Sequence, residues 1–290
     1  MATYVFRINS ISECVHIATI RIQRLISLGL CLASVSAQSN AAEVATGFID
    51  ISRFEPTFIE DFNDGLDVSP WGEPRSRWIA HTPWNGDFGD AKFVDPEVGF
   101  PFTVEAGVLR IEARKDMNGT WSSGLISSID AKGRGFAQDG GYFEARMKVP
   151  PGAGTWPAFW LIGTDRGVIT AEIDVMEHYG HWPDRFTSSR HVWRRQDSVK
   201  NNSAHQRTVL DDGVLADSFH QFGVEIRAEE LVFYFDRSEV WRIPKPDEFE
   251  GQKFYPLVNL ALGSGWPIDD TPSPSYLYVD YVHVWRPIDR

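Results

Sequence analysis

The chain has 290 residues, of which 42% are hydrophobic and 23% charged, a composition typical of a globular protein with a sizeable core. With a formal net charge of −12, the protein repels nucleic acid and anionic membranes, which favours a neutral partner.

The first 37 residues differ from the rest of the chain. Three arginines precede an apolar run, Leu25 to Ala37, that ends in the small residues Val-Ser-Ala. This pattern is typical of a secretory signal peptide cleaved before Gln38, and a second cleavage site after Ala42 stays open. A membrane anchor is the alternative, although spanning a bilayer takes about 20 apolar residues and this run is shorter. The segment therefore predicts a secreted or periplasmic protein with no membrane contact after cleavage.

Both cysteines, Cys14 and Cys31, lie inside the predicted signal peptide. A chain without residues 1–37 would have neither disulfides nor thiolate chemistry. It would also lose three arginines and one glutamate, which moves the formal net charge from −12 to −14, and would keep all 11 tryptophans. Most of these aromatics are expected in the core, and a share exposed in a groove would suit the flat faces of sugar rings.

From residue 45 onward the chain shows no fixed-period repeat and no long linker, so we predict one domain, 45–290. Short apolar or alternating runs are separated by Gly, Pro, Asn and Asp, which indicates an all-β sandwich. The predicted strands are Val108–Lys115, Gly124–Asp130, Gly141–Val149, Ala158–Gly163, Ala171–Glu177, Gln221–Ala228, Leu231–Asp236, Pro256–Gly263 and Tyr276–Trp285.

Three further segments add detail to this prediction. Residues 231–243 predict a hairpin that turns at Asp236-Arg237-Ser238. Strict alternation in the last strand makes both of its faces largely apolar, with Asp280 as the exception. Residues 81–102 have no clear period and predict loops, where residues that contact substrate tend to lie.

Three carboxylates, Glu172, Asp174 and Glu177, lie within six residues and alternate with apolar side chains. Like charges so close together raise the pKa of at least one acid, which suits a proton donor beside an ionised nucleophile. Retaining glycoside hydrolysis needs two such carboxyls about 5–5.5 Å apart. Glu177 has the wrong parity for the face of Glu172 and Asp174, and a β-bulge at Val175 or Met176 would return it to that face.

The acid triplet and its surroundings resemble glycoside hydrolase family 16, in the laminarinase and agarase branches with the spacing E-x-D-x-x-E. The resemblance covers residues 55–287 and rests on motifs in the family's order: Glu60–Asp64, Trp121–Ser128, Gly141–Pro150, Pro151–Gly163, Ala171–Glu177, Gly263–Pro267 and Val279–Trp285. It implies a concanavalin A-like β-jelly-roll of two curved antiparallel sheets, with a substrate groove across the concave sheet.

The resemblance also implies residue roles. Glu172 matches the nucleophile, Glu177 the acid/base and Asp174 the assisting acid between them. The matched substrate-binding residues are Trp156, Trp160, His191 and Trp266. One departure is Leu125, where laminarinases often carry arginine, and this weakens an assignment to laminarin.

Metal sites are a weaker prediction. The resemblance matches Asp280 to a residue that helps to bind a structural calcium, and a carboxylate paired with a nearby arginine is an equal alternative. Glu177, His178 and His181 could suggest a metal centre, but alternation points His178 away from its neighbour. We therefore expect no cofactor for catalysis. Four arginines follow the acid strand and form either a salt-bridged edge or a cationic groove wall: Arg185, Arg190, Arg194 and Arg195.

The predicted function is that of a secreted, endo-acting, retaining β-glycanase that hydrolyses β-1,3- or mixed β-1,3/1,4-glucans by double displacement. We expect a monomer with a polysaccharide as its partner. The alternatives are hydrolysis of an agar-type galactan or a bacterial exopolysaccharide, transglycosylation, and a non-catalytic carbohydrate-binding protein on the same fold. A binding protein would be expected to have lost one of the acids, whereas all three are present.

Overall fold

The computed structural model describes residues 47–73, 76–195 and 200–288. The predicted signal peptide, residues 1–37, and the alternative cleavage site after Ala42 lie outside the described residues. Within the described part of the chain, no helix is both long and apolar enough to cross a bilayer.

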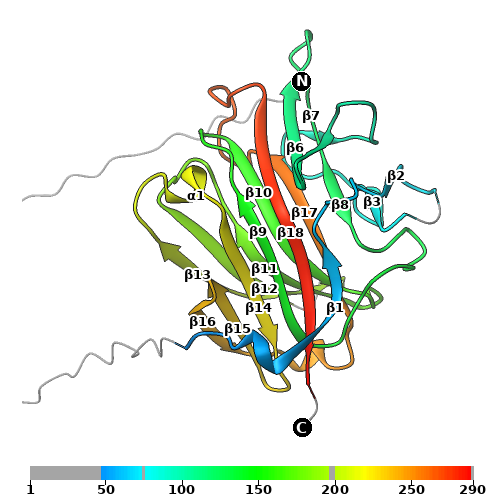
Figure 1. Cartoon of the computed structure of the whole chain (residues 1–290), viewed down its shortest axis with the longest axis vertical. Coiled ribbons are helices and arrows are strands. Elements are labelled where there is room, and N and C mark those ends of the chain that lie inside the picture. Colours follow the sequence, from blue (N-terminus) through cyan, green and yellow to red (C-terminus); the bar gives the residue numbers. More distant parts are fainter. Residues whose placement is uncertain (1–46, 74–75, 196–199, 289–290) are drawn as a thin grey trace, which may run out of the picture. The chain divides into compact units, whose positions relative to one another are not determined.

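The described residues form two β-sheets with very little helix (Figure 1). The larger sheet has ten strands, in the order β16 (Ser238–Pro244), β15 (Glu230–Phe235), β14 (His220–Ile226), β9 (Gly141–Lys148), β18 (Ser275–Pro287), β6 (Val108–Lys115), β7 (Trp121–Ser123) and β4 (Lys92–Phe93), with β1 (Phe54–Glu60) paired to β18 and β5 (Phe102–Glu105) paired to β6.

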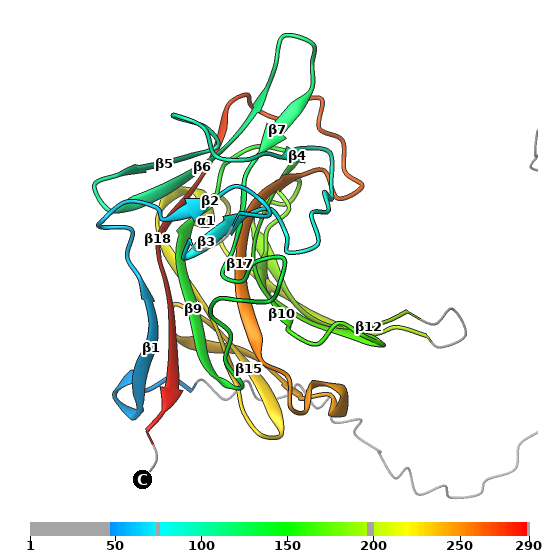
Figure 2. The ribbon, with the colours of Figure 1, turned by 90° about the vertical axis from the view of Figure 1, so that its right-hand side faces the viewer.

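The smaller sheet has eight strands, in the order β13 (Asn202–Val209), β12 (Arg185–Arg194), β11 (Ile169–Glu177), β10 (Thr155–Gly163), β17 (Phe254–Leu262), β8 (Leu125–Ser127), β3 (Trp78–Ala80) and β2 (Val68–Ser69). The helical elements are single turns: η1 (Ile51–Arg53), α1 (Val214–Asp217) and η2 (Asp247–Phe249). Figure 2 separates the two layers, with β1, β18 and β9 on the left and β17, β10 and β12 on the right.

The predicted all-β sandwich is confirmed, and every predicted strand is present with bounds that shift by a few residues at most. Pairing is antiparallel throughout except in two short pairs, β2 with β3 and β4 with β7. The predicted hairpin is β15–β16, and its turn consists of Asp236 and Arg237, both with positive φ. Such left-handed residues match the twist of the strands that they join.

The core lies between the two sheets, and strand alternation decides which side chains enter it. On β10, Phe159 and Leu161 join the same buried cluster as Phe143 and Met147 of β9 in the other sheet. Trp160 points to the outer face of the smaller sheet, where it belongs to a second cluster with Leu257 and other residues. All nine residues of β17 are buried, so the smaller sheet is covered on both faces at its centre.

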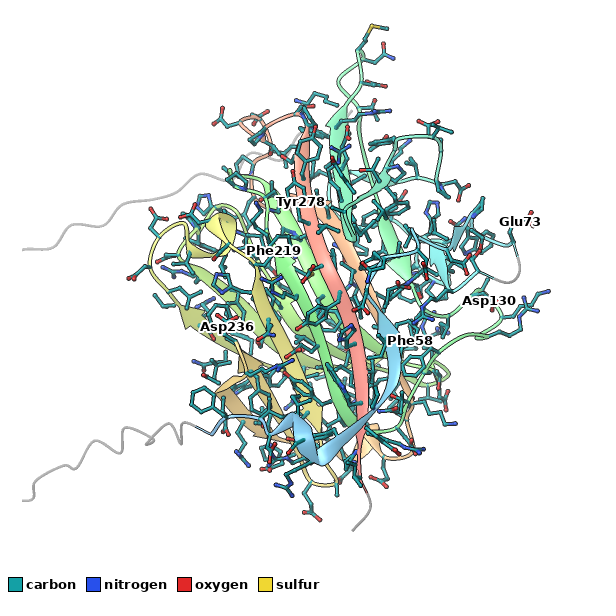
Figure 3. The ribbon with its side chains drawn as sticks, viewed as in Figure 1. Phe58, Glu73, Asp130, Phe219, Asp236 and Tyr278 are labelled. Carbon is teal, nitrogen blue, oxygen red and sulfur yellow. The ribbon has the colours of Figure 1, made fainter. Side chains whose placement is uncertain are left out.

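The strict alternation predicted for the last strand is wrong. Leu277 and Val279 enter the core, but Val282 and Val284 then do so as well, which reverses the parity. The reversal occurs where the pairing of β18 with β9 skips Asp280, a β-bulge. The outer face of the larger sheet carries aromatic and basic side chains; for example, Lys148 lies over the rings of both Phe219 and Tyr278. Figure 3 labels these two rings.

Candidate active site

A bulge in β11 brings the three acids to one face, as the sequence predicts. Asp174 of β11 pairs with Trp160 of β10, whereas Met176 pairs with Phe159, so Val175 has no partner. Val175 and Met176 both enter the core. Because two successive residues point inward, Glu177 returns to the groove face, and it lines the same two pockets as Glu172 and Asp174.

Glu177 is held by two aromatic hydrogen-bond donors. The indole Nε1 of Trp156 donates to Glu177 Oε1 over 3.1 Å, and the hydroxyl of Tyr179 donates to the same oxygen over 2.9 Å. The two rings stack on each other with centroids 5.9 Å apart. Burial raises the pKa of Glu177, and these hydrogen bonds oppose the rise because they stabilise the ionised form.

Glu172 and Asp174 meet His191, which lies on the neighbouring strand β12. His191 Nε2 lies 3.0 Å from Asp174 Oδ2, and its Nδ1 lies 2.7 Å from the Ser203 hydroxyl of β13. Its ring stacks on Trp193, whose indole hydrogen-bonds Glu172. Burial lowers the pKa of His191, which favours the neutral imidazole at neutral pH.

All three acids have a raised pKa. Burial raises the pKa of Glu172 to about 8, and the charge of Asp174 adds to the rise. Burial and the charge of Glu177 raise the pKa of Asp174 well above its usual range. Three carboxyls this close lose their protons in steps that belong to the cluster. Asp174, the most deeply buried, is the one that we expect to keep its proton, which removes its repulsion of Glu172 and favours ionisation of Glu172.

The groove around the acids has two halves that share Trp156 and the three acids. The first, which we call the Trp160 half, has a volume of about 310 Å³ and lies over β10 and β17. The second, the Trp266 half, has a volume of about 500 Å³ and lies over β12 and β13. The Trp160 half is also lined by Trp84, Asp87, Phe88, Ala158, Trp160 and Asn259. A chain crossing the sheet would pass over the acids between the two halves.

The structure places all the residues predicted to bind substrate in this groove. Trp160 donates its indole N–H to Asn259 Oδ1 over 2.8 Å, which fixes the ring. Trp266 stacks on His181 with centroids 4.4 Å apart and meets Trp182 edge to face. Trp156 and His191 lie beside the acids. Leu125, the departure from the family pattern, is buried in the same cluster as Trp160.

The sequence did not single out several residues of the groove: Trp84, Phe88, Tyr179, Trp182, Trp193 and Asn259. Most of them lie on loops or strand ends, where no period marks which way a side chain points. Tyr179 had one usable signal, because it follows Glu177 by two residues in a segment rich in aromatic side chains.

The predicted metal residues have other contacts. Arg146 Nη1 lies 2.5 Å from Asp280 Oδ2, so this carboxylate is paired with an arginine, the alternative interpretation. His178 Nδ1 lies 2.9 Å from the Arg185 carbonyl oxygen, and His181 stacks on Trp266, so these histidines face different partners. Calcium ligation by Asp280 stays a prediction that this ion pair does not favour.

Among the residues that the structure describes, one set of side chains could hold a cation. The ligand atoms of Glu172, Asp174 and His191 all lie within 4.8 Å of one another. A cation there would have to displace the contact between His191 and Asp174. Three of the four arginines that follow β11 form a bonded edge: Arg185 pairs with Asp184, Arg194 with Glu248, and Arg190 donates to Asn202, all away from the acids.

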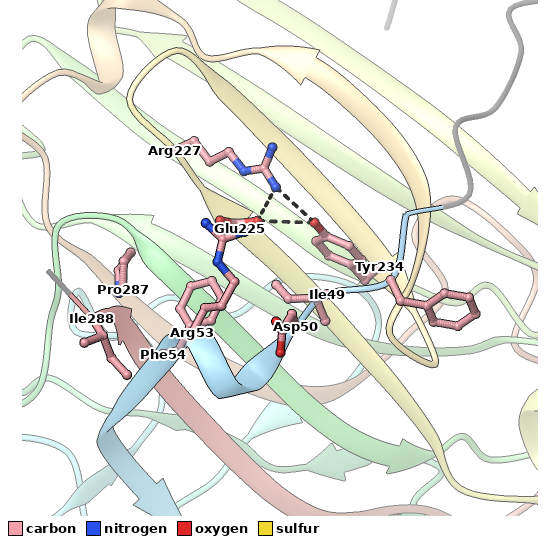
Figure 4. A pocket seen from close by; sticks show the side chains of 10 residues that line it. Ile49, Asp50, Arg53, Phe54, Glu225, Arg227, Tyr234, Pro287 and Ile288 are labelled. Atoms are coloured by element: carbon pink, nitrogen blue, oxygen red, sulfur yellow. Dashed lines mark hydrogen bonds and ion pairs between the residues drawn. The ribbon is translucent and has the colours of Figure 1, made fainter. Parts of the chain in front are cut away.

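A separate pocket of about 430 Å³ lies beside η1, at the N-terminal end of the described residues (Figure 4). Two of its charged groups, Glu225 and Arg227, are paired with each other. Arg227 Nη2 donates to Glu225 Oε2 over 2.7 Å, and the Tyr234 hydroxyl donates to the same oxygen over 3.2 Å. These groups are therefore held by one another, and the chemistry of hydrolysis points to the groove instead.

A β-sandwich with paired carboxyls in an aromatic groove defines a protein of the glycoside hydrolase class. Residues 101–283 match the family described as glycosyl hydrolases family 16. The chain belongs to this family, and the resemblance predicted from its motifs is confirmed.

Two similar relatives come from Rhizobium meliloti (strain 1021). The endo-1,3-1,4-beta-glycanase EglC is 31% identical over 280 residues, which cover 88% of this chain and 57% of that relative. The endo-1,3-1,4-beta-glycanase ExsH is 33% identical over 198 residues, which cover 64% of this chain and 39% of that relative. The chain thus spans only about half the length of these relatives.

A solved structure shares the fold. The laminarinase catalytic domain from Thermotoga maritima MSB8 has a TM-score of 0.61 and 23% identity, covering 81% of this chain and 99% of that chain. At this identity the likeness shows the fold, a jelly-roll of two sheets, which is the fold that the resemblance implied.

Proposed function

We propose that this protein is an endo-acting, retaining β-glycanase that hydrolyses β-1,3- or mixed β-1,3/1,4-glucans. The observation that carries the proposal is the bulge at Val175, which turns Glu177 onto the groove face of Glu172. The names of three relatives support the substrate class, since two are endo-1,3-1,4-beta-glycanases and a third is a beta-glucanase of Rhodothermus marinus, 30% identical over 207 residues. The predicted signal peptide supports action outside the cytoplasm.

In the first step, a carboxylate oxygen of Glu172 bonds to the anomeric carbon while the glycosidic C–O bond breaks. Glu177 gives its proton to the departing sugar oxygen. In the second step, Glu177 removes a proton from water, the water oxygen bonds to the anomeric carbon, and the bond to Glu172 breaks. The proton ends on Glu177 and the product keeps its β configuration.

Asp174 and His191 act through Glu172. A protonated Asp174 does not repel the Glu172 carboxylate, and the contact with His191 Nε2 fixes the orientation of Asp174. In the free protein, Glu177 has more hydrogen-bond donors than Glu172, which favours an ionised Glu177. Before the first step, Glu177 must therefore gain a proton and Glu172 must lose one, since the mechanism needs a protonated Glu177 and an ionised Glu172.

The test is cleavage of a polysaccharide panel: laminarin, lichenan, agarose, carrageenan and a succinoglycan-type polymer, with the linkage of the products determined. We expect cleavage of laminarin or lichenan, and loss of at least about 10³-fold in rate for Glu172→Gln and for Glu177→Gln, because each removes one half of the mechanism. Glu250→Gln, an exposed acid outside the groove, is the matched control. Cleavage of agarose, carrageenan or the exopolysaccharide alone would replace the substrate proposal, and binding without any cleavage would favour a carbohydrate-binding protein.

Azide separates the roles of the two glutamates. With an activated aryl glycoside as donor, Glu172→Gly should be rescued by azide to an α-glycosyl azide, because azide replaces the nucleophile in a single displacement. Glu177→Ala should instead give a β-glycosyl azide, because azide then attacks the glycosyl-enzyme. The opposite pair of products would exchange the two roles.

A further inference from the structure

Trp84 is a half-exposed tryptophan on the wall of the Trp160 half of the groove. It lies on the loop of residues 81–91, far from the acids in the sequence, and its side chain is 39% exposed. Its ring meets Trp160 edge to face, with centroids 6.4 Å apart, and both rings line the pocket that contains Glu172. The two indoles therefore form a corner beside the acids, with the face of Trp84 nearly perpendicular to that of Trp160.

The loop is built to present this ring. Gly86 N donates to Thr82 Oγ1 over 3.0 Å, and Asn85 N donates to the Thr82 carbonyl oxygen over 2.9 Å, which closes a tight turn around Trp84. A Cβ on Gly86 would lie 2.8 Å from two atoms of the Trp84 indole. The ring thus packs against the turn itself, and only glycine leaves room for it there.

Arg166 holds the ring from a second loop. This residue lies between β10 and β11, and its guanidinium carbon is 3.7 Å from the centroid of the Trp84 ring. Its Nε atom is buried and has no hydrogen-bond partner among the described residues. Arg166 is partly buried, and a cation over an indole face offsets part of the cost of removing its guanidinium from water.

Among the described residues, the groups that face Arg166 do not offer it a competing partner at bonding distance. Its charge is attracted by Glu172 and by the Tyr255 hydroxyl and repelled by Arg195, and burial lowers its pKa. The Tyr255 hydroxyl is itself buried without a hydrogen-bond partner. Arg166 therefore remains with the ring of Trp84, at the edge of the acid cluster.

We propose that Trp84 is a sugar-binding wall of the Trp160 half, which takes the apolar C–H face of a pyranose ring, and that Arg166 is the positioning residue that holds its indole. The proposal rests on the proposed function, because it concerns how the same groove binds a β-glucan. Aromatic faces suit such sugars because their axial C–H groups form a flat apolar surface.

The first test is steady-state kinetics on whichever polymer of the panel the wild type cleaves. We expect Trp84→Ala to raise KM about 5- to 30-fold with kcat within about twofold, because stacking contributes to binding and not to the chemical step. Trp84→Phe, which keeps an aromatic face, should recover much of the loss and guards against a folding defect. Phe48→Ala removes an aromatic side chain that is 74% exposed outside the groove, and is the matched control.

The second test asks whether Arg166 acts through Trp84. Arg166→Met keeps the apolar stem and removes the cation, and should raise KM about 3- to 10-fold; Arg166→Lys should be intermediate. The double variant Trp84→Ala/Arg166→Met should have the KM of Trp84→Ala alone, because the arginine has then lost the ring that it positions. Additive effects of the two substitutions on KM, or no recovery of KM by Arg166→Lys, would overturn the positioning role.

The third test measures binding without turnover. In a Glu172→Gln background, calorimetric titration with a glucan oligosaccharide should show the same loss of affinity for Trp84→Ala as the KM values show. An unchanged affinity and KM for Trp84→Ala, in a protein that cleaves the polymer, would overturn the proposal. No cleavage of any polymer by the wild type would instead contradict the proposed function, so the two failures are distinguishable.

Discussion

Glu172, Asp174 and Glu177 are ionisable groups that the fold keeps largely out of water. Burial is the largest cause of the raised pKa of each of them. Side chains of the groove hydrogen-bond Glu177 and Glu172, and His191 contacts Asp174. Among the described residues, no arginine or lysine forms an ion pair with any of the three acids. Ionisation of the cluster at alkaline pH therefore destabilises the fold. A catalytic site tolerates this cost because its reaction needs an acid that keeps its proton.

This gives a pH-dependent prediction for Glu172→Gln. A carboxyl whose pKa is raised from about 4.5 to about 8 stabilises the fold fully below pH 4.5, and this stabilisation is lost as the pH rises through 8. The neutral amide has no such loss. We expect equal Tm values for variant and wild type near pH 4, and a variant that is more stable near pH 9 by about 1–3 kcal/mol.

Thermal unfolding followed by circular dichroism at a series of pH values measures this difference. Glu250→Gln is the control, since Glu250 is exposed and its ion pair in the described part of the chain is with Lys245. A constant difference between Glu172→Gln and wild type across this range would mean that Glu172 ionises normally in the folded protein.

At the scale of elements, β11 and β18 show what alternation can and cannot predict. In β11 the acids mark the groove face, so the wrong parity of Glu177 predicts a bulge at Val175 or Met176, and the structure has it at Val175. In β18 both faces are largely apolar, and no polar residue marks a change of face, so the bulge at Asp280 was missed. Asp280 is the polar exception in this strand. A single acidic residue in a sequence does not indicate whether it is a metal ligand, a salt-bridge partner or the site of a bulge.

The edge strand β13 was missed for a different reason. Its residues, Asn202–Val209, are mostly exposed, so neither face carries an apolar pattern that alternation could detect. Strand β12 was not among the predicted strands, and on it the resemblance predicted only the role of His191. These two strands form a groove wall only because they pair with each other. The sequence of a single strand does not indicate which strand it pairs with.

The turn that follows β11 carries Tyr179, which holds the carboxylate of Glu177, and it gives a prediction at the scale of elements. A Cβ on Gly180 would lie 2.0 Å from the Gly152 carbonyl oxygen and 2.4 Å from Thr155 Oγ1. Gly180→Ala must therefore move the turn that carries Tyr179, the hydrogen-bond donor to Glu177. We expect a loss of about 1–3 kcal/mol in the free energy of unfolding, together with reduced kcat.

Gly167→Ala is the matched control, in the loop at the other end of β11. Its Cβ would meet only the Asp165 side chain, at 3.3 Å, and that carboxylate can move. Urea denaturation compares the two variants. A Gly180→Ala protein as stable and active as Gly167→Ala would show that the turn adapts without disturbing Glu177.

At the scale of the whole molecule, the groove combines segments that are distant in the sequence. Trp84 comes from the loop after β3, Tyr179 from the turn after β11 and Trp266 from the loop after β17. Composition and alternation predicted the sandwich, and the motif predicted the acids, because both depend on local pattern. The two halves of the groove are built partly by loops, whose sequences have no periodic pattern. Only the substrate-binding residues matched by the resemblance were therefore predicted.

The salt bridge of Asp280 leads to a prediction about metal dependence for the whole fold. Calcium takes six to eight oxygen ligands, and a carboxylate already paired with Arg146 has its charge offset without a cation. We therefore expect excess chelator to leave Tm unchanged in the full chain, and added calcium to have no effect. Arg146→Gln should lower stability by up to about 1 kcal/mol, since the pair is partly exposed. A fall in Tm with chelator that calcium reverses would restore the calcium interpretation, and loss of that response in Asp280→Asn would locate the ion at this bulge.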